Sequence, residues 1–110
     1  MARKKTTATR LVLDGALTIR TAETTYTKLL EVAERPVVEL DCGGATEVDL
    51  SFVQLVLAAR ASARRRQQVL RLAQPPEGPL YETLQRGGFL AASIDGATAD
   101  QAFWLQPTRT

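Results

Sequence analysis

The chain has 110 residues, of which 45% are hydrophobic and 24% charged, and this composition is typical of a globular protein with a single core. The absence of histidine excludes imidazole acid–base catalysis, histidine-dependent triads and the usual zinc and iron ligands. Cys42 is the only cysteine, which excludes an internal disulfide and a cysteine-based zinc site, and we expect a buried thiol there. We therefore predict no enzymatic activity, catalytic residue, cofactor or metal.

The net charge is only +2, but the basic residues are unevenly distributed. One cluster lies within residues 1–8, which we expect to be a disordered basic N-terminus before a single domain over residues 9–106. No apolar stretch reaches the roughly 20 residues of a membrane span, and residues 1–10 lack the apolar segment of a secretory signal. We therefore expect a cytoplasmic protein. A second basic cluster, in the last turns of a predicted helix, leaves nucleic-acid binding as a remote alternative: Arg60, Arg64, Arg65 and Arg66.

Within residues 10–19, apolar residues recur at every second position, and Asp14-Gly15 interrupts this pattern: Leu11 and Leu13, then Leu17 and Ile19. Because Asp-Gly between such runs is a strong hairpin signal, we predict two short antiparallel strands. Thr21 is then a plausible N-cap of a helix that ends before Pro36. Apolar residues recur on one face of this predicted helix: Tyr26, Leu29, Leu30 and Ala33.

A compact β-branched run between Pro36 and Gly43-Gly44 predicts a central strand. We expect a loop over residues 46–50, a long helix over residues 52–63 lying against the sheet, and another strand over residues 69–72. A third helix is predicted by its start, its buried face and its C-terminal cap, which are in turn Pro79, then Leu80 and Leu84, then Gly87-Gly88.

Thr98 and Gln101 predict a short terminal helix, and Phe103 and Trp104 are expected to fold back on the core. This order of elements predicts an α/β fold. It is a small mixed, largely parallel β-sheet of four to five strands with an N-terminal β-hairpin, packed against three to four α-helices.

The order of elements and the segment over residues 38–52 resemble the STAS domain, the module shared by anti-sigma factor antagonists and by the tails of sulfate transporters. The resemblance covers roughly residues 11–90. In the antagonists a strand ends in an aspartate, here Asp41, and an Asp-Ser-Ser-Gly signature later opens a helix. Asp49 matches the signature aspartate, and Ser51 matches the serine that a partner kinase phosphorylates. Leu50 and Phe52 replace the first serine and the glycine, which implies a bulkier and more apolar kinase-facing surface.

Two interpretations of Ser51 remain open. Ser51 precedes an apolar helix and stands three residues before Gln54, so it could serve only as an N-cap in a capping box, worth about 1 kcal/mol. A phosphate at the same position would meet free N–H groups and the positive end of the helix dipole. Asp49 is likewise either a turn-former or alternative N-cap, or a residue that shapes the phosphoacceptor loop.

The resemblance implies a non-enzymatic bacterial signalling module that binds an anti-sigma factor or serine-kinase-like protein, with phosphorylation of Ser51 as its control. The alternative is a constitutive adaptor subunit of a chemotaxis-type signalling complex or of a lipid-transport complex, which Leu50 and Phe52 favour slightly. Phe52 is itself either a core residue or a docking anchor. The predicted partner-binding residues are Thr46, Glu47, Asp49, Leu50, Ser51, Phe52, Gln54 and Leu55.

Overall fold

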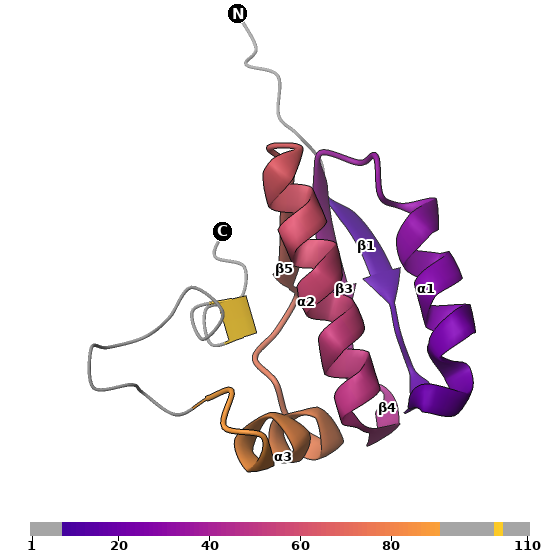
Figure 1. The fold of residues 1–110 in the computed structure, drawn as a ribbon, viewed down its shortest axis with the longest axis vertical. Coiled ribbons are helices and arrows are strands. Elements are labelled where there is room, and N and C mark those ends of the chain that lie inside the picture. The colour runs from indigo at the N-terminus through magenta and orange to yellow at the C-terminus, as the bar shows by residue number, and fades with distance from the viewer. Residues whose placement is uncertain (1–7, 91–102, 105–110) are drawn as a thin grey trace, which may run out of the picture.

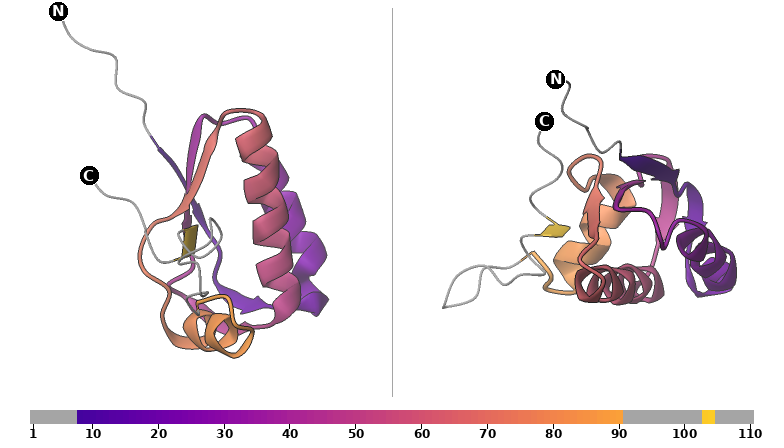
Figure 2. Two further views of the ribbon diagram at one scale, coloured as in Figure 1. Left: turned by 60° about the vertical axis from the view of Figure 1, so that its left-hand side comes forward. Right: turned by 90° about the horizontal axis from the view of Figure 1, so that it is seen from above.

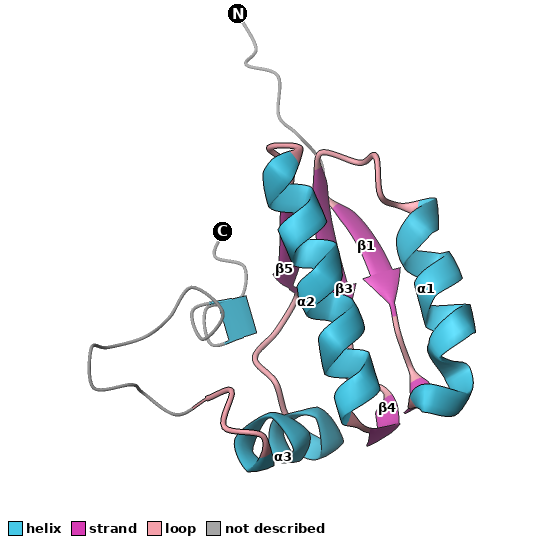
Figure 3. Cartoon of the chain, viewed as in Figure 1, coloured by secondary structure: helices cyan, strands magenta, loops and turns pink. Residues whose placement is uncertain are grey.

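A computed structural model describes residues 8–90 and 103–104, which form an α/β fold (Figure 1). The elements in chain order are β1 (Thr9–Val12), β2 (Gly15–Leu17), the 3-10 helix η1 (Ile19–Thr21), α1 (Ala22–Glu31), β3 (Val37–Asp41), β4 (Ala45–Val48), α2 (Leu50–Arg65), β5 (Val69–Leu72) and α3 (Gly78–Arg86). Helices α1 and α2 lie side by side on the same side of the strands, and α3 lies near β4 (Figures 1 and 2). Figure 3 shows the same arrangement by type of element.

The described residues form two parallel sheets, one of three strands in the order β1-β3-β5 and one of two strands, β2-β4. The prediction of one sheet with four to five strands is therefore only partly right. The strands predicted over residues 37–42 and 69–72 are confirmed, and β3 is the central strand of its sheet. The predicted loop over residues 46–50 is wrong, because its first residues form β4 by pairing with β2, a partner that is distant in the sequence.

The predicted N-terminal hairpin is also wrong, because β1 and β2 follow one another in the same direction beside β3 and β4. The Leu13 N–H donates to the Asp41 carbonyl at 2.9 Å, and the Gly15 N–H donates to the Gly44 carbonyl at 3.0 Å. A type I′ hairpin turn needs positive φ at both central residues. Of Asp14 and Gly15 only Gly15 has it, at 73°, so the pair kinks the chain and shifts the register without reversing it.

The core lies between the sheet and α2. Val38 and Leu40 alternate with half-buried residues along β3, so that one face of the strand is turned to the core. The residues that α2 buries are Phe52, Val53 and Val56, each 1% exposed or less. Since full burial of such a side chain stabilises the fold by about 1.5–3 kcal/mol, this contact holds the sheet and helix together.

The opposite face of β3 is polar and carries two ion pairs to its neighbouring strands. Arg10 of β1 contacts Asp41 at 2.9 Å, and Arg71 of β5 contacts Glu39 at 3.0 Å. Because the Arg10 side chain is 54% exposed, solvent screens that pair and it is worth at most about 1 kcal/mol. The pairs favour the correct neighbours across β3, while apolar burial on the other face supplies most of the stability.

The first helix covers the core only in part. Thr25 and Leu29 are its buried residues, whereas Tyr26 and Leu30, which were predicted to share its buried face, are 52% and 55% exposed. The apolar stripe of α1 is thus wider than the surface that α2 and the sheet offer it. Thr21 occupies the N-cap position but makes no side-chain cap to α1. Its hydroxyl oxygen accepts the Thr18 N–H at 3.0 Å and donates to the carbonyl of Ala16 at 2.8 Å.

The last described segments agree with the sequence-based prediction. In α3, Leu80 and Leu84 are buried, proline stands in the first turn, and Gly87 and Gly88 follow the helix, with Gly88 at φ 81°. Phe103 and Trp104 belong to the core, where their rings pack edge to face with centroids 4.9 Å apart. The remainder of the predicted terminal helix, including Thr98 and Gln101, lies outside the described residues. Residues 1–7 of the predicted N-terminal tail also lie outside them. None of the described helices has the length and apolar character needed to cross a membrane.

The opposite orientations of two residues in the first turn of α2, Leu50 and Phe52, predict a large difference in their effects on stability. Phe52→Ala should lower the free energy of unfolding by about 3–5 kcal/mol, because it empties a buried site. Leu50→Ala should change it by less than about 0.5 kcal/mol, because Leu50 is 50% exposed. Urea unfolding followed by circular dichroism measures both, and equal losses would contradict the orientation of α2.

Candidate functional site

The start of α2 is organised by the carboxylate of Asp49. Asp49 has the extended backbone of an N-cap residue, and its Oδ1 accepts hydrogen bonds from the Ser51 N–H at 3.0 Å and from the Ser51 hydroxyl at 2.5 Å. The prediction that Ser51 is the N-cap is therefore wrong, and the alternative of Asp49 is confirmed. The helix begins at Leu50, one residue before Ser51, and Asp49 already accepts the Ser51 N–H, which the Gln54 side chain would accept in a capping box.

The same carboxylate also binds a segment that is distant in the sequence. Oδ2 of Asp49 accepts a hydrogen bond from the backbone N–H of Ile19 at 2.9 Å, and the Asp49 N–H donates to the Leu17 carbonyl at 3.2 Å. The bond from the Ser51 hydroxyl, together with backbone N–H groups of Ile19, Ser51 and Phe52, lowers the pKa of Asp49 below its usual value, against an opposing effect of burial. Asp49 is therefore ionised at neutral pH and joins the turn after β2 to the start of α2.

Two exposed apolar side chains stand next to this hydrogen-bonded cluster. Leu50 is 50% exposed, and Ile19 is 68% exposed. Gln54 is exposed one turn further along α2, beside Leu50 and Ser51 on the helix surface. We call these residues the cap surface: Ile19, Asp49, Leu50, Ser51 and Gln54. In Figure 1 it lies at the end of α2 that is close to β4 and to the start of α1.

Sequence reasoning missed Ile19, which it placed in a strand of the predicted hairpin. No local signal identifies Ile19, because its hydrogen bond to Asp49 links residues that are 30 positions apart. The sequence pattern of an apolar residue near a strand end is the same whether the side chain points to the core or to solvent.

The other predicted partner-binding residues are in different environments. Thr46 and Glu47 are exposed on β4, and Leu55 is half-buried on α2. Phe52 is 1% exposed and belongs to the core, so the prediction that it contacts a partner is wrong. In the first turn of α2, the Phe52 side chain points into the core between the helix and the sheet. The Leu50 side chain stays half exposed to solvent.

The chemistry available at the cap surface is limited to one hydroxyl and one ionised carboxylate. The short hydrogen bond from the Ser51 hydroxyl to Asp49 orients the hydroxyl toward the ionised carboxylate. Among residues 8–90 and 103–104, no group of three or more potential metal ligands lies close together. Cys42 is buried as predicted, and burial raises the pKa of its thiol to about 12.

Comparison with known families agrees with this architecture. Residues 1–91 match the family model described as "Mlab, STAS domain". Neither a search of curated proteins nor a search of solved structures found a significant match. Because the family match spans most of the chain, the chain belongs to the STAS domain family. STAS domains are in general signalling or regulatory modules, typically interact with proteins and are generally non-enzymatic.

The lowered pKa of Asp49 predicts a pH-dependent contribution to stability. A folded-state pKa below the unfolded value means that the contribution is fully present above the ordinary carboxyl pKa of 3.8 and is lost as pH falls through the folded-state pKa. Asp49→Ala should therefore cost about 1–2 kcal/mol at neutral pH, with a smaller deficit below about pH 3.5.

Urea unfolding at several pH values measures this difference between the variant and the unmodified protein. Ser51→Ala is the matched control, because it removes one of the donors and leaves the bonds from the backbone N–H groups of Ile19 and Ser51. A deficit for Asp49→Ala that stayed constant across the acid range would show that the carboxylate charge does not matter.

Proposed function

We propose that this protein is a regulatory module that binds another protein through the cap surface, and that phosphorylation of Ser51 controls the binding. The observation that carries the proposal is the position of the Ser51 hydroxyl. It lies in the first turn of α2, half-buried, beside the exposed side chain of Leu50 and near Ile19. A partner that covers these two apolar side chains would also cover the hydroxyl, so a change at Ser51 is felt by the partner.

A phosphate on Ser51 would alter the cap surface in a defined way. The esterified oxygen could no longer donate to Asp49, and about −1.5 to −2 units of charge would be added beside an ionised carboxylate. The helix dipole offsets part of the repulsion, so the fold persists. The N–H of Ser51 is shared with Asp49, however, and competition for it would weaken the link from Asp49 to Ile19. The surface thereby changes from mostly apolar to strongly anionic.

The partner that fits the unmodified protein has an apolar patch that faces Leu50 and Ile19. After phosphorylation, the added negative charge repels this partner or leaves the phosphate without a polar contact. Two properties are required of this partner: it must bind the part of the cap surface that carries the Ser51 hydroxyl, and it must respond to the phosphate. A serine kinase or an anti-sigma-like protein has both. Such a partnership belongs to the cytoplasm of a bacterium. In this proposal the chain supplies the docking site and the acceptor group, and the partner performs the chemistry.

A second candidate is a constitutive adaptor, a subunit that docks through the same cap surface without modification. Two observations favour it. Leu50, where the antagonists have a serine, is half exposed, which makes the surface suitable for permanent contact. The matching family model carries the description "Mlab, STAS domain" and not that of an antagonist. The complex would be of a chemotaxis-type signalling or lipid-transport kind.

Phosphorylation is tested by intact-mass analysis after incubation with ATP and a lysate of the native host. The unmodified protein should gain the mass of one phosphate, and Ser51→Ala should gain none. Ser62→Ala, which alters another serine of the same helix, is the matched control and should gain the phosphate. A mass that stays unchanged in all three proteins would favour the constitutive adaptor.

Docking is tested by the recovery of a co-purifying partner with variants of the cap surface. Leu50→Glu and Ile19→Glu should each reduce recovery at least about tenfold, because they place a charge where an apolar contact is required. Tyr81→Glu, at an exposed position on α3, should have no effect. Ser51→Asp should lose the partner and Ser51→Ala keep it if phosphorylation is the control. Full recovery with Leu50→Glu and Ile19→Glu would show that the partner docks elsewhere.

A further inference from the structure

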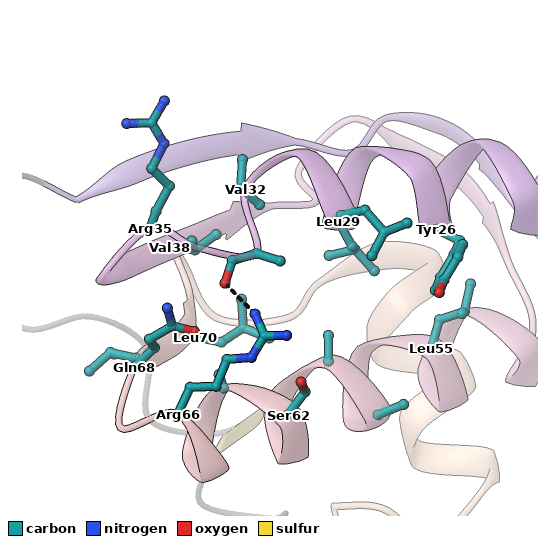
Figure 4. A pocket seen from close by; sticks show the side chains of 16 residues that line it. Tyr26, Leu29, Val32, Arg35, Val38, Leu55, Ser62, Arg66, Gln68 and Leu70 are labelled. Carbon is teal, nitrogen blue, oxygen red and sulfur yellow. Dashed lines mark hydrogen bonds between the residues drawn. The ribbon is translucent and has the colours of Figure 1, made fainter.

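A groove runs between α1 and α2 (Figure 4). Its volume is about 350 Å³, within the range of small-molecule sites. The walls are side chains of the two helices, and the floor includes Val38 of β3 and Leu70 of β5. The groove thus reaches down to the sheet between two helices that contact one another elsewhere.

The rim of the groove exposes apolar side chains that the fold leaves uncovered. Tyr26 and Leu30 of α1 are 52% and 55% exposed, and Val69 of β5 is 44% exposed. Apolar surface left in water costs about 25 cal/mol per Å², so a molecule that covered these side chains would be held by their burial. The lining is therefore suited to an apolar occupant.

The width of the groove selects a thin occupant. On the α2 side the lining is made largely of small residues, among them Ala59, Ser62 and Ala63. These leave a slot down to the sheet. An α-helix with its side chains is about 10–12 Å across and would not enter between two helices in contact. An unbranched hydrocarbon chain is much thinner and can lie along the slot.

The two ends of the groove differ in polarity. Leu55 lies toward one end, and Arg66 and Gln68 lie at the other, after the end of α2 (Figure 4). None of the lining residues is acidic. Among the described residues, the Arg66 guanidinium donates one long hydrogen bond, 3.4 Å, to the carbonyl of Ala33, and a guanidinium has further N–H groups that can bind a ligand. Arg35 adds a second positive charge nearby, although its side chain points away from the groove in Figure 4.

We propose that this groove binds a single-chain amphiphile with an anionic head, namely a fatty acid. Its chain lies between α1 and α2, and its carboxylate lies at Arg66. The helix rises about 16 Å from Leu55 to Arg66 at about 1.5 Å per residue, the reach of a medium-length acyl chain. The guanidinium supplies a charge-assisted hydrogen bond at one end, and burial of Leu30 and Tyr26 supplies the apolar contact along the chain.

Isothermal titration calorimetry with dodecanoate, below its micelle concentration, tests the charge and the chain together. Dodecyltrimethylammonium is the matched ligand, because it has the same chain and a cationic head. Dodecanoate should bind saturably at one per chain, and the cationic ligand at least about tenfold more weakly. Equal affinity for the two ligands, or no binding of dodecanoate, would overturn the proposal.

Variants of Arg66 and of its neighbour Arg64 locate the carboxylate of the fatty acid. Arg66→Gln should weaken dodecanoate binding about tenfold. Arg64→Gln, an exposed position in the last turn of the same helix and outside the groove lining, should leave it within about twofold of the unmodified protein. Thermal unfolding checks that both variants are folded. Equal losses in the two variants would show a general charge effect and no site at Arg66.

Methyl NMR spectroscopy locates the chain independently of any variant. Dodecanoate should shift the methyl resonances of Leu30, Leu55 and Leu70, and should leave those of Leu84, a buried residue of α3 outside the groove lining, unchanged. Shifts at Leu84 without shifts at Leu30 would place the ligand elsewhere and overturn the proposal. Leu50→Glu, the variant of the cap surface, should bind dodecanoate normally, so failure of one proposal is distinguishable from failure of the other.

Discussion

The carboxylate of Asp49 is the group on which the site depends, because it joins two stretches of backbone, the one at Ile19 and the first turn of α2. It caps α2, accepts the hydroxyl of Ser51 and fixes the N–H of Ile19. Without it, the bond from the Ile19 N–H to the start of α2 would be lost, and the backbone bond from the Asp49 N–H to the Leu17 carbonyl would remain. Its lowered pKa has the same origin, since donors that favour the ionised form converge on a single group.

Helix α2 connects the cap surface with the groove. Its buried residues fasten it to the sheet, its first turn carries Ser51, and its flank forms one wall of the groove. Leu55 stands one turn after Ser51 and lines the groove, so the two surfaces are adjacent on the same helix. The partial cover that α1 gives is consistent with the groove, because Tyr26 and Leu30 stay about half exposed at its rim. A fold with so small a sheet leaves such surfaces for ligands or partners.

The errors of the sequence-based prediction share one physical cause. Asp14-Gly15 has the composition of a hairpin turn, but a single positive φ at Gly15 only kinks the chain, and the strands found partners beyond residue 36. The segment before Asp49 has few apolar residues and was predicted as a loop, yet it pairs with β2. Ser51 has the spacing of a capping box with Gln54, but Asp49, two residues earlier, accepts the Ser51 N–H. In each case a distant or competing partner outweighed the local signal.

The sequence by itself determined the elements that local rules control. Apolar periodicity identified α2, proline and glycine bounded α3, and a β-branched run identified the central strand, while the resemblance to the STAS domain drew attention to Asp49 and Ser51. Only the tertiary structure decided that Phe52 faces inward, that Leu50 faces outward, and that β1 and β2 pair with β3 and β4 instead of with each other. Periodicity encodes which side chains share a face, whereas the energy that orients that face comes from pairing and burial between residues some 30 positions apart.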